Sequence, residues 1–404
     1  MKNPFRSRGS FLVGLAAFVL VIALSPVAAG AVTQSWSVVP SPSAGLSTDS
    51  LWAVSCVSTT ECTAAGDYFD GTRYSTLIEH WNGSAWTIVS SPNASSADTY
   101  VNSVSCVAAT SCFAVGGYDD GVRNATFVMR WDGTAWTIVA SPNAGSSDND
   151  LRSVSCVSAT SCTAVGFYNT GVRYETLTER WDGTAWTIVA SPNAGANGNT
   201  LWSVSCVSAT NCTAVGNYEI NSHAETLTLL WNGTTWSIIA SPNVGTSYNL
   251  LNSVSCVSAT SCIAGGHSFT GTRDETLFLH WDGTAWTIVS SPNYGTSNNF
   301  LRSISCVSTT ACTAVGNSND GVRAVPVLLQ WDGAAWTIAI GPTAGPGNNY
   351  PRGVSCVSAS DCTAVGSFND NGRYVTLILQ SVDPTPPTTT TTASADPVVP
   401  AFTG

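Results

Sequence analysis

The chain has 404 residues, 14 of them cysteine and 15 tryptophan, and its formal net charge is −11. This negative charge argues against binding to nucleic acid or to anionic membranes, because both would repel the protein. Ser, Thr, Asn and Gly are abundant, whereas Met is scarce and only 10% of the residues are charged. Such a composition is typical of strands and turns, so we expect an all-β protein.

The first 31 residues have the features of a secretory signal peptide. Lys2, Arg6 and Arg8 precede an apolar run from Phe11 to Leu24, and small residues follow up to Ala31. The apolar run is too short to span a bilayer as a helix, and no later stretch is longer. We therefore predict cleavage after Ala31 and a secreted protein without a transmembrane segment.

Residues 32–381 contain seven copies of a 50-residue unit, and no insertion or deletion disturbs the cysteine spacing. A period of this length with strand-like content indicates a β-propeller. Because the cysteines are even in number, regularly spaced and exported, they predict one structural disulfide per unit rather than metal or redox sites. The predicted bridges are Cys56–Cys62, Cys106–Cys112, Cys156–Cys162, Cys206–Cys212, Cys256–Cys262, Cys306–Cys312 and Cys356–Cys362.

Each unit is predicted to form four antiparallel strands, and the third unit serves as the example. Alternating small, apolar and polar residues predict its strands at Ser153–Cys156, Cys162–Gly166, Tyr174–Trp181 and Ala185–Val189. Gly171 marks the turn before the third strand, and Asn221 and Asn371 take this turn position in two other units. Asp182-Gly183 predicts a tight hairpin turn before the last strand.

The two ends of the array complement each other. The seventh unit lacks its fourth strand, whereas Ser35–Pro42 matches the fourth strand of the first full unit at a spacing of 50 residues. An N-terminal strand that completes the last blade would close the ring and remove its exposed edges. We therefore predict a seven-bladed β-propeller with four antiparallel strands per blade, the last blade closed by the N-terminal strand.

Two short motifs carry a resemblance to known propellers. Ala114–Tyr118 contains a double glycine similar to that of kelch repeats, and Trp181–Trp186 is similar to the Asp-box of sialidases, although its Asp and Gly are adjacent. Over residues 35–381 the chain resembles seven-bladed propellers of the kelch and sialidase-like kind. The resemblance concerns architecture, and it implies no catalytic residues here.

The C-terminal residues 382–404 are rich in Pro and Thr, with five threonines at 388–392. This composition predicts a disordered, extended tail or stalk. Pro400–Gly404 resembles a bacterial sortase sorting motif without the hydrophobic segment and basic tail that follow in that family. The tail is thus a candidate for attachment to the cell wall or surface.

Thirteen of the fifteen tryptophans recur at two repeat positions, which predicts packing between blades. The other two occupy the second position of a near-constant frame, where the remaining units carry Asn or Arg. A variable position within a fixed frame is where a repeat protein can place ligand contacts. The candidate contacts at this position are Trp52, Asn102, Arg152, Trp202, Asn252, Arg302 and Arg352.

The eleven arginines beyond residue 31 fall at three repeat positions. Three lie in the variable set above and two, Arg130 and Arg180, end the third strand of their units. The others, with one histidine, follow the turn between the second and third strands, and we include them as candidate contacts: Arg73, Arg123, Arg173, His223, Arg273, Arg323 and Arg373. They predict an anion-recognising face unless nearby carboxylates pair with them locally.

No sequence motif points to catalysis, a cofactor or a metal site. The histidines are scattered, and paired carboxylates cannot be recognised from the sequence. We therefore expect a monomeric, secreted or cell-surface module that binds an extracellular glycan or protein. The binding face would be formed by the turns between the second and third strands and by the loops that connect one unit to the next. A propeller glycoside hydrolase or lyase acting on external polysaccharide and a structural scaffold without a small ligand remain the alternatives.

Overall fold

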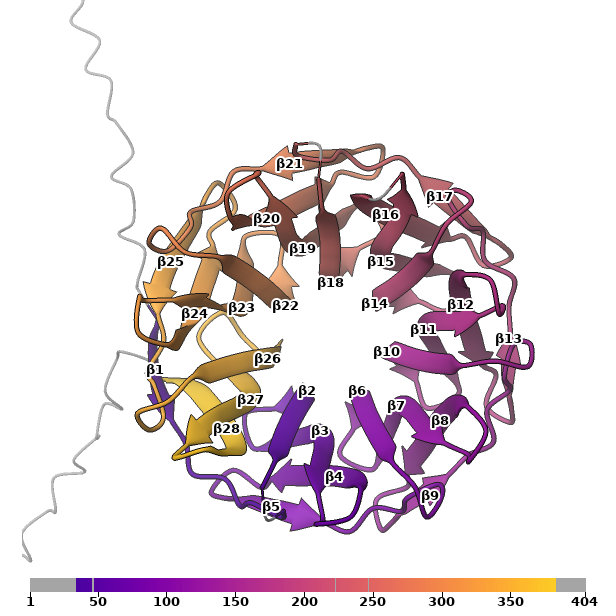
Figure 1. Ribbon diagram of the computed structural model, residues 1–404, viewed down its shortest axis with the longest axis horizontal. Coiled ribbons are helices and arrows are strands. Elements are labelled where there is room, and N and C mark those ends of the chain that lie inside the picture. Colours follow the sequence, from indigo (N-terminus) through magenta and orange to yellow (C-terminus); the bar gives the residue numbers. More distant parts are fainter. Residues whose placement is uncertain (1–33, 46, 222, 246, 383–404) are drawn as a thin grey trace, which may run out of the picture. The chain divides into compact units, whose positions relative to one another are not determined.

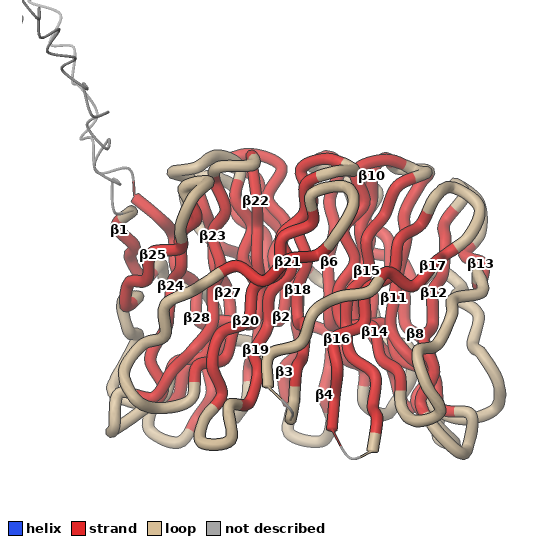
Figure 2. Tube along the Cα trace, turned by 90° about the horizontal axis from the view of Figure 1, so that it is seen from above, coloured by secondary structure: helices blue, strands red, loops and turns tan. Residues whose placement is uncertain are grey.

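The computed structural model describes residues 34–382 except 46, 222 and 246. The predicted signal peptide lies outside the described residues, and so does the predicted tail except for its first residue, Val382, which ends the last strand. Within the described range, seven four-stranded antiparallel sheets stand side by side in a ring (Figure 1). The strands run between two rims of loops and turns (Figure 2). This confirms the all-β, seven-bladed β-propeller.

The innermost strands surround the central channel: β2 (Asp49–Ser58), β6 (Thr99–Ala108), β10 (Asn149–Ser158), β14 (Asn199–Ser208), β18 (Asn249–Ser258), β22 (Asn299–Ser308) and β26 (Asn349–Cys356). The second strands are β3 (Glu61–Phe69), β7 (Ser111–Asp119), β11 (Ser161–Asn169), β15 (Asn211–Ile220), β19 (Ser261–Phe269), β23 (Ala311–Asn319) and β27 (Cys362–Asp370). The third strands are β4 (Tyr74–Trp81), β8 (Asn124–Trp131), β12 (Tyr174–Trp181), β16 (His223–Trp231), β20 (Asp274–Trp281), β24 (Ala324–Trp331) and β28 (Arg373–Val382). The outermost strands are β5 (Trp86–Val89), β9 (Trp136–Ile138), β13 (Trp186–Ile188), β17 (Trp236–Ile239), β21 (Trp286–Val289), β25 (Trp336–Ile340) and β1 (Ser35–Val38).

The inner strands are longer than the sequence pattern predicts, whereas the third strand of the example unit has the predicted bounds. In β10 the ladder with β11 extends back to Asn149, which pairs with Tyr168. The polar residues before Leu151 look like loop in the sequence, but their backbone hydrogen bonds continue the sheet. The outermost strand β13 is shorter than predicted by one residue at each end. Asn221 and Asn371 adopt the predicted positive φ, at 45° and 53°.

The N-terminal strand closes the ring as predicted. β1 pairs antiparallel with β28, so that Trp36 lies opposite Ser381 and Val38 opposite Leu379. The side chain of Gln34 donates a hydrogen bond of 2.8 Å to the carbonyl oxygen of Ser360, in the first turn of the seventh blade. The first blade also packs on the seventh, because Val365 and Ile378 share a buried cluster with Leu51.

The hydrophobic core lies between the blades. One cluster joins Phe113 and Val128 of the second blade to Leu151 and Trp181 of the third, and the rings of Phe113 and Trp181 lie 5.2 Å apart. The paired tryptophans before and after each hairpin turn also pack on each other, as Trp181 and Trp186 do at 6.0 Å. This confirms packing as the role of the repeated tryptophans.

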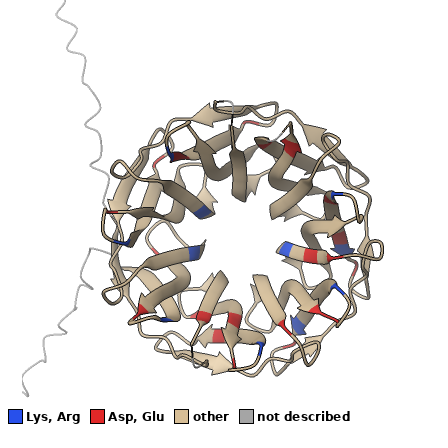
Figure 3. Cartoon of the chain, in the orientation of Figure 1, with Lys and Arg blue, Asp and Glu red and all other residues tan. Residues whose placement is uncertain are grey.

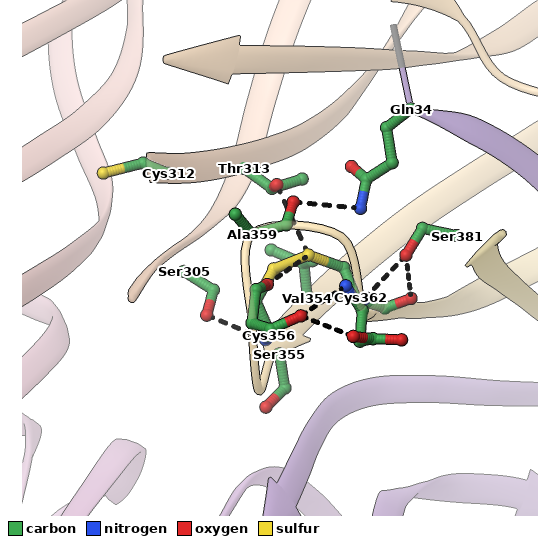
Figure 4. Close-up of a disulfide and its surroundings, with 12 residues drawn as sticks. Gln34, Ser305, Cys312, Thr313, Val354, Ser355, Cys356, Ala359, Cys362 and Ser381 are labelled. Atoms are coloured by element: carbon green, nitrogen blue, oxygen red, sulfur yellow. Dashed lines mark hydrogen bonds between the residues drawn. A yellow bond between two sulfur atoms is a disulfide. The ribbon is translucent and has the colours of Figure 1, made fainter. Parts of the chain in front are cut away.

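All seven predicted disulfides are present, and they lie near the end of the innermost strands. Figure 4 shows the bridge between Cys356 and Cys362 in the seventh blade. The backbone N–H of Cys356 donates to Ser305 Oγ of the preceding blade at 3.0 Å (Figure 4). Disulfides are typical of proteins in oxidising compartments. Within the described residues, no helix is long and apolar enough to cross a membrane.

The serine directly before the first cysteine of each unit joins neighbouring blades. In each of the seven blades the serine before the first cysteine accepts a hydrogen bond from a cysteine N–H of the next blade, for example Ser155 from Cys206 at 3.0 Å. We call these seven serines the serine belt: Ser55, Ser105, Ser155, Ser205, Ser255, Ser305 and Ser355. The belt runs around the whole ring and holds the innermost strands in register with one another.

Candidate functional site: the mouth of the central channel

Every innermost strand contains a β-bulge at the variable repeat position. In β10, Leu151 pairs with Gly166 and Ser153 pairs with Val165, so Arg152 is the extra, unpaired residue. A side-chain atom on Gly166 would lie 1.9 Å from the carbonyl oxygen of Asp150, so only glycine permits this close approach. Bulges redirect side chains and recur beside functional sites. The repeated glycine thus explains why the variable side chain reaches the channel.

The seven bulged side chains meet in one cavity of about 720 Å³ at the mouth of the channel. Figure 3 shows basic residues on β10, β22 and β26, three of the innermost strands around the centre of the ring. We call the seven bulged residues the channel-mouth residues. They are the seven that the sequence predicts at the variable position: Trp52, Asn102, Arg152, Trp202, Asn252, Arg302 and Arg352.

The two tryptophans are fixed in place by their own blades. Trp52 Nε1 donates to Asp67 Oδ1 at 2.6 Å, and Trp202 Nε1 donates to Asn217 Oδ1 at 2.7 Å. Each indole also carries a guanidinium over its ring, Arg352 at 4.9 Å from Trp52 and Arg152 at 5.2 Å from Trp202. Because each arginine comes from the preceding blade of the ring, these cation–π contacts join adjacent blades.

The two asparagines reach to the next blade. Asn102 Nδ2 donates to Asp150 Oδ1 at 2.8 Å and to the carbonyl oxygen of Leu151 at 2.9 Å. Asn252 Nδ2 donates to the carbonyl oxygen of Leu301 at 2.7 Å. Both amides therefore use their N–H groups within the ring.

The three arginines of the mouth differ in their partners. Arg152 forms an ion pair of 2.9 Å with Asp150. The guanidinium group of Arg302 lies 5.3 Å from the ring of Phe300, and that of Arg352 lies 5.6 Å from the ring of Tyr350. Among the described residues, neither arginine forms an ion pair or a hydrogen bond. Burial, followed by the charge of Arg302, lowers the pKa of Arg352 to about 10. Burial lowers the pKa of Arg302 as well.

A second cavity of about 480 Å³ opens beside the mouth, over the first three blades. Asp67 and Asp150 line it together with Tyr74 and Tyr100. Burial raises the pKa of Asp67 to about 7 and that of Asp150 to about 6, against the hydrogen bond from Trp52 and the charge of Arg152. Carboxyl groups with raised pKa values in a cavity are candidates for binding or proton transfer.

The candidate contacts after the second strand line neither cavity. Most of them pair with carboxylates: Arg73 with Asp70, Arg123 with Asp120, Arg173 with Glu175, His223 with Glu225, Arg273 with Glu275, and Arg373 with Asp49. Several also donate to carbonyl oxygens of the loop that leads to the next blade, as Arg323 does to Gly345 at 3.0 Å. Through these ion pairs and hydrogen bonds, the arginines and the histidine stabilise the loops between the blades.

Sequence reasoning missed the residues that surround the variable side chains. Asp67, Asn217 and His267 occupy one position of the second strand in three different blades, and each lies beside the mouth. Burial, together with the charge of Arg302, lowers the pKa of His267 to about 4, so this side chain is neutral at pH 7. Variation at this repeat position was the available signal, but it looks like ordinary surface variation until the bulge is known.

Comparisons with models of known protein families and with curated proteins give no match. Among solved structures, the chain is similar to one described as YCF48 bound to D1 peptide, with a TM-score of 0.53 and 12% sequence identity. The match covers 86% of this chain and 95% of the other. This similarity supports the propeller fold, and it does not distinguish a kelch or sialidase-like subtype.

Proposed function

We propose that this protein is an extracellular binding module whose ligand enters the mouth of the central channel. One observation carries the proposal: seven similar blades direct a side chain that varies between Trp, Asn and Arg, by seven equivalent bulges, into a single cavity. The residues that are constant between units form the ring, while the Trp, Asn and Arg side chains give different parts of the cavity wall different chemical properties. A purely structural ring would have no need to vary the residues at this position.

A protein segment is the ligand class that we favour over a glycan. The two tryptophans suited to stacking on sugars each have an arginine over the ring, and their N–H groups are already bonded. The propeller structure to which this chain is similar is described as YCF48 bound to D1 peptide, so a protein of this fold binds a peptide. The seven disulfides favour an oxidising compartment and hence secretion.

The test is a blind selection of ligands from a displayed peptide library and from a glycan array. The wild-type protein is compared with the double variant Asn102→Trp/Asn252→Trp, which fills the mouth with a residue that two other blades already accept there. Thr187→Trp, on the exposed outermost strand β13, adds a similar side chain far from the mouth and serves as the control.

We expect ligands that bind the wild type and Thr187→Trp equally and bind the double variant at least tenfold more weakly. Equal binding by all three proteins would place the ligand elsewhere and refute the proposal. Selection of glycans alone would refute the preference for a protein ligand.

The second cavity supports one alternative, a glycoside hydrolase. Two carboxyl groups with raised pKa values, Asp67 and Asp150, line it. Hydrolases of this kind use one protonated and one ionised carboxyl group. Release of reducing sugar from an extracellular polysaccharide, lost in Asp67→Asn, would favour this alternative over a binding module.

A further inference from the structure

The same bulged position holds an arginine in three blades, and the residue two places earlier determines whether that arginine is neutralised. In the third blade this residue is Asp150, which pairs with Arg152 at 2.9 Å. In the sixth and seventh blades it is aromatic, so the guanidinium groups of Arg302 and Arg352 face rings at 5.3 and 5.6 Å instead of a carboxylate. At the same repeat position, Arg152 therefore has an ion pair with a carboxylate, whereas Arg302 and Arg352 have none.

Arg302 and Arg352 stand in adjacent blades and repel each other. Their innermost strands, β22 and β26, are neighbours in the ring (Figure 1), and the positive charge of Arg302 lowers the pKa of Arg352. Their Nε atoms, like that of Arg152, are buried and have no hydrogen-bond partner among the described residues, but only Arg152 has an ion pair through its Nη2. Burying like charges that no ion pair neutralises is unfavourable, and a guanidinium remains protonated at neutral pH. The pair is therefore a cationic site open to the cavity.

The charge balance around the pair favours a ligand with a single negative charge. The neighbouring carboxylate of Asp274 acts on Arg302 electrostatically and offsets part of its charge. His267, next to Arg302, is neutral at pH 7 because burial lowers its pKa to about 4. Two positive charges and the one negative charge of Asp274 leave roughly one positive charge to neutralise, which suits a carboxylate better than a doubly charged phosphate.

From this geometry we propose that Arg302 and Arg352 form a subsite that binds a carboxylate group of a partner peptide. The proposal rests on the proposed function and specifies the chemistry at one side of the mouth. The guanidinium groups of Arg302 and Arg352 can both donate hydrogen bonds to the same carboxylate. Arginine suits this role because its planar guanidinium group matches the geometry of a carboxylate. We leave Arg152 out of the subsite, because one of its Nη groups already forms an ion pair with Asp150.

The test follows the Nε–Hε resonances of ¹⁵N-arginine-labelled protein during titration. The probes are N-acetyl-trialanine with a free carboxylate, the same peptide as its amide, trigalacturonate and inorganic phosphate. We expect the free carboxylate to shift the resonances of Arg302 and Arg352 more than that of Arg152, whose Nη2 is already paired with Asp150, and the amide to shift none of them. Tighter binding of trigalacturonate or phosphate than of the peptide would overturn the peptide assignment.

Two variants separate binding from folding. Phe300→Asp/Tyr350→Asp supplies each arginine with the internal partner that Arg152 has, and should weaken peptide binding at least tenfold while leaving both arginines in place. Arg302→Asn/Arg352→Asn installs a residue that the second and fifth blades accept at this position, and should have the same effect. Unchanged binding in both folded variants, or no shift of either resonance up to tens of millimolar peptide, would overturn the proposal.

The failure of this subsite would differ from a failure of the proposed function. If ligands selected from the library lost affinity in Asn102→Trp/Asn252→Trp but not in Phe300→Asp/Tyr350→Asp, the mouth would still be the binding site and only the carboxylate inference would be wrong.

Discussion

At the residue scale, two buried glutamates depart from the repeat. Glu79 and Glu179 are fully buried at a position where the other blades carry Met129, Leu229, Leu279, Leu329 and Leu379. Burial raises the pKa of both carboxyl groups to about 8. Each therefore keeps its proton at neutral pH in the folded protein, where an apolar side chain would fit the core without that requirement.

Replacing Glu179 by Leu should stabilise the fold by about 1–3 kcal/mol, because it removes a buried and incompletely bonded polar group. The effect should grow with pH. Between about pH 4.5 and 8 the folded protein binds more protons than the unfolded chain, so the unfolding free energy falls as pH rises. Glu179→Leu should flatten this slope, as measured by chemical unfolding at pH 5 and pH 8.

The reverse substitution provides the control for this effect. Leu279→Glu should destabilise the protein and steepen the same slope. An identical pH dependence in both variants and the wild type would contradict the assignment of the raised pKa values.

Two adjacent glycines, Gly116 and Gly117, differ in whether the structure leaves room for a side chain. A side-chain atom on Gly116 would lie 2.0 Å from the carbonyl oxygen of Tyr100, whereas one on Gly117 would find its nearest neighbour at 3.5 Å. Gly116→Ala should therefore cost about 1–3 kcal/mol through overpacking, while Gly117→Ala should be nearly neutral. Thermal unfolding of the two variants measures this difference, and equal midpoints would contradict the explanation of the bulge.

At the element scale, the serine belt couples neighbouring blades. Ser155→Ala leaves the backbone N–H of Cys206 without its partner, and we expect a loss of about 0.5–1.5 kcal/mol. Hydrogen exchange at the Cys206 amide should become faster, whereas Thr187→Ala on the exposed strand β13 should leave it unchanged. Unaltered exchange in Ser155→Ala would show that the belt does not hold the strands together.

The strands and disulfides were predictable because their signals are local. Tyr174–Trp181 alternates in type between two recognisable turns, and each cysteine pair encloses one short turn, so the sequence alone determines the partners. The bulge at Arg152 was not predictable, because it depends on how closely the backbone of Asp150 approaches Gly166 across the sheet. The repeated glycine was visible in the sequence, but its steric purpose was not.

The candidate site was predictable only in part for a similar reason. Variation within a constant frame identified the seven channel-mouth residues, and the structure places them in one cavity. It did not separate them from the arginines after the second strand. Arg152 and Arg173 each pair with a carboxylate two residues away in the sequence, but only the structure shows that Arg152 lies at a bulge and reaches the channel whereas Arg173 does not line it.

At the scale of the whole molecule, the ring depends on the pairing of β1 with β28. Removal of residues 34–42 would expose the edge of β28 and withdraw Trp36 from the core of the seventh blade. We expect a lower unfolding midpoint, with faster hydrogen exchange first in residues 373–382. A permuted chain with residues 34–42 joined after residue 382 should recover both properties, and its failure to do so would contradict closure as the source of the stability.

The binding of a selected peptide to a set of single alanine variants tests most directly where the ligand binds. The set comprises the seven channel-mouth residues and, as a matched group, the arginines after the second strand, each variant checked for folding by thermal unfolding. Losses of affinity should fall on the channel mouth and be largest at Arg302 and Arg352, while Arg73, Arg123 and Arg173 should change affinity less than twofold. Losses concentrated on the latter group would show that the outer loops, and not the channel mouth, bind the ligand.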